Sequence, residues 1–378
     1  MPSFDTNCYE SSYSSAISPS ENKHAHKDET GAFSDVMPAD WRQWLAKHSN
    51  ETNTEITIDK VEPTSLHTDW GCGISIKLLF QTRTEVEPVP STTKAFFKAA
   101  YADMFHYDAE SHLREVKAFY LDRILKTNVV LPCIGYHLDP QQILVEDENT
   151  WATIRENLMC VNEKPSQHDA SSDHGTATVE GSIMLWMYDL QTVDKEKIVE
   201  KSRLFNSSKN DIVRPLKDRE ELESAMNYAI FHYLGACMKS EHNHFSYKKK
   251  KRRNDSSLDG NFGRQYVAID NDRCMTPKAI FSNREVVPDL HFNRIQLWEE
   301  LVFERICQIS HHRFPVLQVV REAADSATKS GFISSHLMKA LENDALSSEL
   351  ALSQPEAFFE IDERINKLGE YIRQTCPQ

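Results

Sequence analysis

The stretch KAFFKAAYADMFHYDAESHLREVKAFYLDRIL, residues 94–125, predicts a strand followed by a helix. Phe96 and Phe97 with small neighbours favour a half-buried strand, and this strand carries Lys98. After a polar stretch, apolar residues recur at steps of three and four, as in a helix: Leu113, Val116, Tyr120 and Ile124. Glu115 lies on that helix. We therefore expect a lysine on a strand to be followed by a glutamate on a helix.

This order of lysine and glutamate has two interpretations. Two solvated charges are the ordinary one, because lysine and glutamate are mostly exposed. The other is a nucleotide site, in which Lys98 contacts the phosphates and Glu115 holds the lysine in place, as in kinases. The rest of the chain has to decide between them.

Composition narrows the class of protein. The chain has 378 residues, 40% of them hydrophobic, which suffices for one large domain or two lobes. A net charge of −14 argues against nucleic acid as a partner, since phosphate backbones need clustered Lys and Arg. We see no membrane span and no signal peptide at the N-terminus, which by itself indicates a cytoplasmic protein.

Further segments along the chain have predicted structures. We expect residues 1–38 to be disordered and Pro38 to His48 to form a short helix. Gly71 and Gly73 form a Gly-rich turn before the Lys98 strand, where backbone N–H groups could approach phosphates; an ordinary hairpin turn is the alternative. Buried strands are predicted at 134–138, 183–187 and 265–269. In a two-lobed kinase, the strand at 183–187, which includes Met184, would be the lobe connection.

A carboxylate stands where the last of these strands ends. Asp270 follows it directly, and hard cations such as Mg²⁺ prefer oxygen ligands, although a turn aspartate facing water is the plainer explanation. The remainder is predicted to be helical, with a core helix over 221–239 and an apolar stripe in the last segment: Phe358, Ile361, Ile365, Leu368 and Ile372. Lys248 to Arg253 is an unbroken basic run, interpreted as a solvated loop, with a patch for an acidic partner or a nuclear localisation signal as the alternatives.

Taken together, the motifs GISIKLLF, AFFK, EVKAFYLDRIL, VEGSIMLWM, AIFHYL, AIDN, ERICQIS and IDERINKL resemble the atypical secretory-pathway kinases. This family includes the Golgi casein kinase, the glycosaminoglycan xylosylkinase and, more distantly, the four-jointed kinase. The resemblance implies an α+β, two-lobed, protein-kinase-like fold. A β-rich N-lobe would span 39–182, including the packing helix and the glutamate helix, and a mainly helical C-lobe would span 183–378.

The resemblance also implies ligands and site residues. ATP with Mg or Mn would be bound, with nucleotide contacts from Gly71, Gly73, Lys98, Glu115 and Met184 and metal contacts from Asp270 and Glu115. We expect Lys98 and Glu115 to form an ion pair facing Asp270. The acceptor would be a protein serine or a glycan (xylose) hydroxyl. The compartment would be the Golgi lumen or the outside of the cell, whereas the N-terminal sequence shows no signal peptide and indicates the cytoplasm.

The catalytic loop departs from the family. Its aspartate, which would take the proton of the acceptor hydroxyl, is replaced by Lys239 in an ungapped alignment. Glu241, His242 or His244 could substitute if the loop is shifted, and a zinc site through Cys237, His242 and His244 is a further alternative. Three functions stay open: an active kinase, a nucleotide-binding pseudokinase that activates a partner kinase, and a scaffold without nucleotide.

The resemblance makes one prediction about cysteines. In the family, a cysteine before an Ile-rich helix bonds to one at the end of the last helix, and these positions match Cys307 and Cys376. We therefore expect their Cα atoms to lie within about 4.4 to 6.8 Å. A second family disulfide is expected to be missing from this chain.

Overall fold

The structure is a computed structural model, and it divides into two compact units. It describes residues 56–67, 73–82, 91–99, 111–138, 179–185, 190–204, 216–237, 244–248, 264–269, 271, 274–275, 288–309, 314–326, 331–342, 344–352 and 355–376. The predicted N-terminal disorder, the helix near Pro38 and the basic run beyond Lys248 lie outside these residues. Within them, no helix combines the length and the apolar character that a membrane crossing requires.

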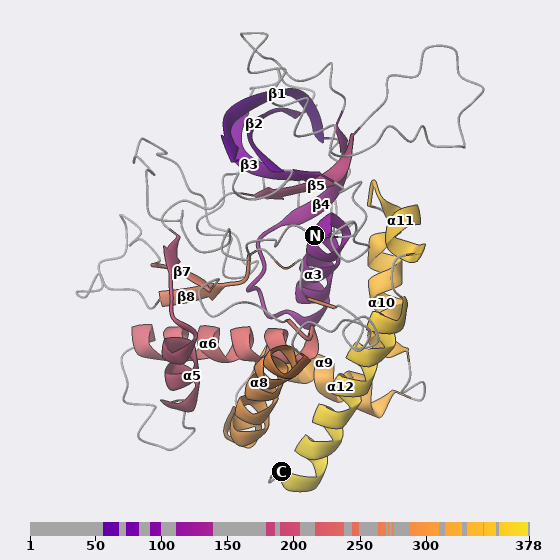
Figure 1. The fold of residues 1–378 in the computed structure, drawn as a ribbon. Helices are drawn as coiled ribbons and strands as arrows, with labels where there is room; N and C mark the ends of the chain where they lie inside the picture. Colours follow the sequence, from indigo (N-terminus) through magenta and orange to yellow (C-terminus); the bar gives the residue numbers. More distant parts are fainter. Residues whose placement is uncertain are drawn as a thin grey trace, which may run out of the picture. The chain divides into compact units, whose positions relative to one another are not determined.

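A five-stranded antiparallel sheet forms the first unit, with strand order β1-β2-β3-β5-β4. Figure 1 shows β1, β2 and β3 curving together. The bounds are Ile56–His67 for β1, Gly73–Thr82 for β2, Ser91–Ala99 for β3, Cys133–Leu138 for β4 and Val179–Leu185 for β5. Every strand predicted in this region is present, although β5 begins at Val179, before the predicted start at Ile183.

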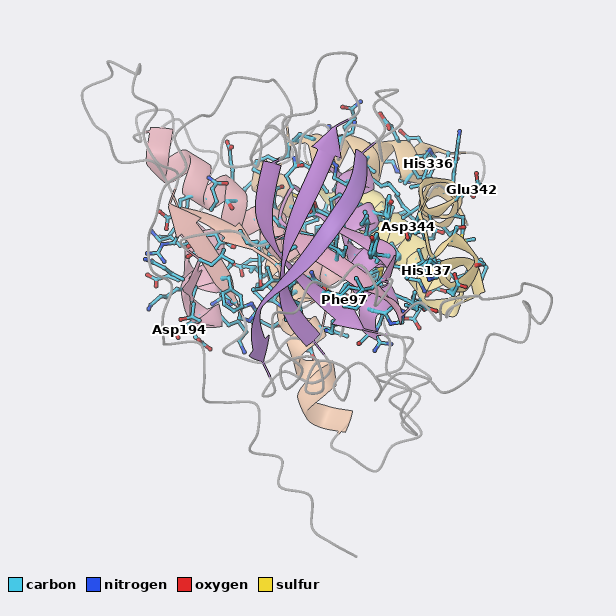
Figure 2. The ribbon with its side chains drawn as sticks, turned by 90° about the horizontal axis from the view of Figure 1, so that it is seen from above. Phe97, His137, Asp194, His336, Glu342 and Asp344 are labelled. Carbon is cyan, nitrogen blue, oxygen red and sulfur yellow. A yellow bond between two sulfur atoms is a disulfide. The ribbon has the colours of Figure 1, made fainter. Side chains whose placement is uncertain are left out.

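One face of this sheet is apolar. Phe97 of β3 lies opposite Ile183 of β5, which lies opposite Ile134 of β4. Phe97, labelled in Figure 2, and Ile183 are fully buried, as is Ala95 on the same face of β3. Because side chains alternate along a strand, Lys98 belongs to the opposite face.

The second unit combines helices with a small antiparallel sheet of order β6-β7-β8. Its strands are Gln191–Thr192, Phe245–Lys248 and Arg264–Val267. In Figure 1, β7 and β8 lie on one side of α6, and α5 and α8 lie on the other side. The helices are α3 Ser111–Leu125, α5 Lys195–Leu204, α6 Leu216–Leu234, α8 Pro288–Ile309, α9 Pro315–Asp325, α10 Phe332–Leu341, α11 Ser347–Leu352 and α12 Pro355–Thr375.

The C-terminal stripe is core, as predicted. Ile361, Ile365 and Leu368 of α12 are fully buried. Gly369 lets this helix approach α9 closely, because a Cβ atom there would lie 2.4 Å from the Cβ of Ala324. The α+β class is therefore confirmed by a β-rich unit and a mainly helical unit.

The residue ranges of the two compact units differ from those of the predicted lobes. Among the described residues, the first unit holds those of 56–112 and 132–185, and the second holds 113–131 and 190–376. The predicted boundary at 182 and 183 therefore falls inside β5. Helix α3 from Leu113 onward groups with the C-terminal helices, and it is fixed to them: Tyr120 donates a hydrogen bond to Asp344, and the Lys117 ammonium lies 5.0 Å from the ring centre of Phe358.

Candidate functional site

In the first unit, Lys98 stands in a row of small residues. Gly73 of β2 lies opposite Lys98 on one side, and Ser182 of β5 lies opposite it on the other. Lys98 is partly exposed, whereas Ser182 is only 1% exposed. The Ser182 hydroxyl has no hydrogen-bond partner in the part of the chain that the structure describes. Residues directly opposite one another point to the same face, so the hydroxyl and the lysine share one side of the sheet.

Two other residues were predicted to contact the nucleotide, and the structure describes one of them. Met184 is buried and lies opposite Phe96 of β3 and Cys133 of β4, on the same face of the sheet as Ser182 two residues earlier. Gly71 lies outside the described residues. Close strand packing accompanies the lysine, because a Cβ atom on Gly181 would lie 2.6 Å from the Lys98 carbonyl oxygen.

A half-buried ion pair between a histidine and a glutamate on this face was not predicted from the sequence. His112 Nε2 lies 2.7 Å from a carboxylate oxygen of Glu180, and His112 is 2% exposed. The hydrogen bond from His112, followed by the charges of His112 and His137, lowers the pKa of Glu180 against the opposing effect of its burial. His137, labelled in Figure 2, lies directly opposite Glu180 across β4 and β5. The sequence offers one sign of this arrangement: Glu180 and Ser182 are two residues apart, so on a strand they share a face.

In the second unit, Glu115 meets the segment that follows β8. The Glu115 carboxylate is 1% exposed, and its Oε2 accepts the backbone N–H of Asn271 at 2.8 Å. That N–H belongs to the peptide bond that joins Asp270 to Asn271. The contact connects positions 156 residues apart in the chain. Asp270 itself lies outside the described residues, so its side chain cannot be placed.

Glu115 supplies one oxygen ligand of the kind that a hard divalent cation prefers. Burial disfavours the charged form of a carboxyl group unless cations or N–H donors stabilise that form. Carboxylate oxygens are also the ligands that Mg²⁺ prefers in proteins. Within the described residues, no group of three His, Cys, Asp or Glu side chains is arranged to hold a metal. A site would therefore need Asp270 in addition to Glu115. The expected Lys98–Glu115 ion pair joins residues of different units and stays a prediction.

The predicted catalytic loop begins where α6 ends. Ala236 has a positive φ of 48°, and the Cys237 N–H bonds to the His232 carbonyl, which ends the helix. Lys239, Glu241 and His242 lie outside the described residues. Cys237 forms a disulfide with Cys274, with Cα atoms 3.9 Å apart. The zinc alternative through Cys237 is therefore wrong, because a metal ligand must be a thiolate. The Cys237–Cys274 bond was not predicted from the sequence. It uses neither cysteine position of the family disulfide that is expected to be missing, so that expectation stays a prediction.

His244, the remaining candidate for a substitute base, is a core residue. It is 1% exposed, and its Nδ1 lies 2.6 Å from the Tyr228 hydroxyl oxygen. His232 stacks on Tyr228 with ring centres 4.0 Å apart, and Trp298 packs at the edge of this group. The aromatic packing explains why the His-rich segment contributes a side chain to the interior.

The cysteine prediction from the resemblance is confirmed. Cys307 and Cys376 form a disulfide, with Cα atoms 4.8 Å apart. The bond joins the end of α8 to the end of α12, which are 69 residues apart in sequence.

Comparison with known proteins finds likeness in structure alone. No protein-family model matches the chain, and no curated protein matches it. A solved structure of hydra Fam20 with sugar is 13% identical, with 90% of this chain and 92% of that chain covered and a TM-score of 0.47. The Golgi casein kinase is 15% identical, with 90% and 77% covered and a TM-score of 0.47.

The same Golgi casein kinase with Mn/ADP bound is 15% identical over 90% of this chain and 79% of that chain, with a TM-score of 0.48. The predicted likeness to such kinases is thereby confirmed as a likeness. Similarity at this level transfers no function, which has to come from the residues.

Proposed function

We propose that this protein binds a nucleotide together with Mg²⁺ or Mn²⁺ and is kinase-like, with phosphotransfer that is weak or absent. Lys98 would contact the phosphates, and Glu115 and Asp270 would hold the metal. The bound metal would neutralise phosphate charge. The chain's own residues would position the ligand and exclude water from it.

The observation that carries this proposal is the Glu115–Asn271 contact. A fully buried glutamate on α3 is used to hold the backbone beside Asp270. Glutamate is almost never fully buried without a partner, and a bound metal would be such a partner for Glu115 beside the Asn271 N–H. The contact supports a role for Glu115 and Asp270 at one metal.

The surroundings of Lys98 support the phosphate part of the proposal. The residues directly opposite the lysine on its two neighbouring strands are a glycine and a serine, both small. The buried Ser182 hydroxyl would be costly to leave without a hydrogen bond, by about 1–3 kcal/mol. A phosphate or ribose oxygen would satisfy it.

Weak phosphotransfer follows from Lys239, which occupies the position of the expected base. An ammonium cannot accept a proton at neutral pH, and Glu241 and His242 remain the candidates for a relocated base. The acceptor, if there is turnover, would be a protein serine or a xylose-bearing glycan. A pseudokinase that activates a partner kinase is the second candidate, because a bound nucleotide without turnover serves that role.

Two disulfides among the described residues favour an oxidising compartment. We therefore propose the secretory pathway, in the Golgi lumen or outside the cell, over the cytoplasm.

The test is calorimetric titration of the full chain with Mn²⁺–ADP, the ligand that one similar solved structure holds, and with Mg²⁺–ATP. We expect binding that Lys98→Met weakens at least tenfold. The matched control is Lys339→Met on α10, at an exposed position, which should bind as the wild type does. No binding of either nucleotide would refute the proposal and favour a scaffold.

Turnover is then measured on casein-like peptides and xylosylated glycans. Weak turnover that disappears with Glu241→Gln or with His242→Gln would identify the relocated base. Robust turnover that survives both changes would contradict the assignment of Lys239 to the base position.

A further inference from the structure

Helix α3 carries a second buried carboxylate that the proposed function does not use. Asp122 follows Glu115 by seven residues, which is about two helical turns, so both side chains lie on one side of the helix. Each is 1% exposed. A buried carboxylate needs an explanation of its own.

Asp122 holds the turn that follows α3. Its Oδ1 accepts the Thr127 hydroxyl at 2.5 Å and the Val129 backbone N–H at 2.9 Å. On either side of Thr127, Lys126 and Asn128 adopt positive φ angles of 56° and 53°. Such angles strain residues other than glycine and persist where the surroundings enforce them. The Asp122 carboxylate is one of the groups that hold this turn, together with the Asp122 carbonyl, which accepts the Thr127 N–H at 3.3 Å.

The segment held by Asp122 leads directly to Asn271. The Val129 carbonyl accepts the Ala268 N–H at 2.7 Å, and Val130 and Ala268 form a parallel bridge. The Ala268 carbonyl accepts the Asn271 side-chain amide at 3.3 Å. The Asn271 backbone N–H then returns to Glu115. The path begins on α3 at Asp122 and ends on α3 at Glu115, so it is closed.

We propose that Asp122 is a positioning residue: through Val129 and Ala268 it sets the place of the Asn271 peptide against Glu115, and thereby the affinity of the site for a divalent metal–nucleotide. The inference rests on the proposed function for its ligand. Asp122 itself does not touch the ligand. The physical reason is that a closed set of buried hydrogen bonds admits one geometry, and removing one member releases the others.

Protonation of Asp122 should act on the same path. Burial raises the pKa of Asp122 to about 6, against the hydrogen bonds from Thr127 and Val129 and the charge of Arg123, the charged neighbour among the described residues. A proton on the carboxyl group weakens its hold on the Val129 N–H, because a charged acceptor forms the stronger bond. The affinity should therefore fall as the pH drops through about 6.

The experiment compares Asp122→Ala with Asp362→Ala in the full chain. Asp362 on α12 is the matched control, since its buried carboxylate also accepts a backbone N–H, that of Ile333 at 2.7 Å. Asp122→Ala should weaken Mn²⁺–ADP binding about tenfold, the lower end of the effect of losing a direct partner of a metal ligand, because Asp122 acts on Glu115 through Val129, Ala268 and Asn271. Asp362→Ala should change it less than twofold. Equal losses in both variants would overturn the proposal.

A conservative variant separates positioning from general damage. Asp122→Asn keeps an oxygen that can accept the Val129 N–H, so it should recover most of the affinity at pH 7. The asparagine side chain does not titrate. The fall in Mn²⁺–ADP affinity between pH 7 and pH 5 that we ascribe to Asp122 should therefore be absent from this variant. A wild-type pH profile that Asp122→Asn leaves unchanged would overturn the proposal.

Amide hydrogen exchange tests the path without any ligand. Asp122→Ala should speed exchange at Ala268 and Asn271 at least tenfold, and Asp362→Ala should not. If the wild type binds no Mn²⁺–ADP, the proposed function fails, and the exchange result still decides whether Asp122 positions Asn271. Unchanged exchange at both amides would overturn the inference.

Discussion

The Tyr120 hydroxyl donates a hydrogen bond to Asp344 Oδ2 over 3.1 Å, and this bond ties the middle of α3 to the turn between α10 and α11. Asp344, labelled in Figure 2, also accepts the backbone N–H of Leu346. The helix that carries Glu115 is thus held by C-terminal helices of the same unit.

Tyr120→Phe should lower the free energy of unfolding by about 1 kcal/mol, since one buried hydrogen bond is lost. Amide exchange along α3 should become faster. Tyr371→Phe on α12, a half-buried tyrosine that packs against Phe303, is the control. If Tyr120→Phe and Tyr371→Phe alter α3 exchange equally, the bond to Asp344 does not hold the helix.

Glu115→Gln should separate metal binding from folding. The amide oxygen of glutamine can still accept the Asn271 N–H, so the melting temperature should change little. Mn²⁺ affinity should fall at least tenfold, because a neutral amide is a poorer ligand for a hard cation than a carboxylate. Calorimetry with Mn²⁺ and a thermal melt measure the two effects. An unchanged Mn²⁺ affinity would remove Glu115 from the metal site.

Gly181→Ala should disturb the Lys98 strand. The added Cβ atom would meet the Phe97 ring at 2.5 Å and the Lys98 carbonyl at 2.6 Å, and a backbone atom cannot move aside cheaply. We expect about 1–3 kcal/mol of destabilisation and weaker nucleotide binding. Gly369→Ala is the control, since it also creates a clash but between α12 and α9. It should lower stability and leave the affinity of the folded protein unchanged.

The two disulfides should differ in their effect on the site. Replacing Cys307 and Cys376 by serine opens a loop of about 70 residues and should lower stability by roughly 4 kcal/mol on the chain-entropy model. Ligand affinity should not change.

Replacing Cys237 and Cys274 by serine should lower stability by a similar amount and also weaken Mn²⁺–ADP binding. The reason is that the Cys274 N–H bonds to the Asn271 carbonyl at 2.9 Å. Urea unfolding and calorimetry on both double variants test this. Equal affinities in the two variants would contradict it.

The stability of the protein should depend on pH through Asp122. Its pKa is about 6 in the folded chain against an ordinary value of 3.8, so the folded state binds more protons between these values. The resulting stabilisation is present near pH 4 and is lost as the pH rises through about 6. The stability difference between the wild type and Asp122→Asn should therefore be about 2 kcal/mol more favourable to the wild type at pH 4 than at pH 7. Urea unfolding of both proteins at the two pH values measures this, and parallel curves would contradict it.

Local spacing was enough to predict the elements that carry the candidate site. Aromatic residues beside small ones predicted the Lys98 strand, and steps of three and four predicted α3 and the buried stripe of α12. These features depend on neighbours within one or two turns, which a sequence displays directly. The resemblance to secretory-pathway kinases added the Cys307–Cys376 pair, which no local pattern contains.

The sequence by itself determined which residues stand on which strand or helix: Lys98 on β3, Glu115 on α3 and a chain that turns at the end of β8. Only the tertiary structure decided which partners they meet. The hydrogen bond from Asn271 to Glu115, the Cys237–Cys274 bond and the burial of His244 and Asp122 all join segments, or remove water from side chains, in ways that no spacing encodes. Desolvation and long-range hydrogen bonding depend on the packed surroundings, and these exist only once the chain has folded.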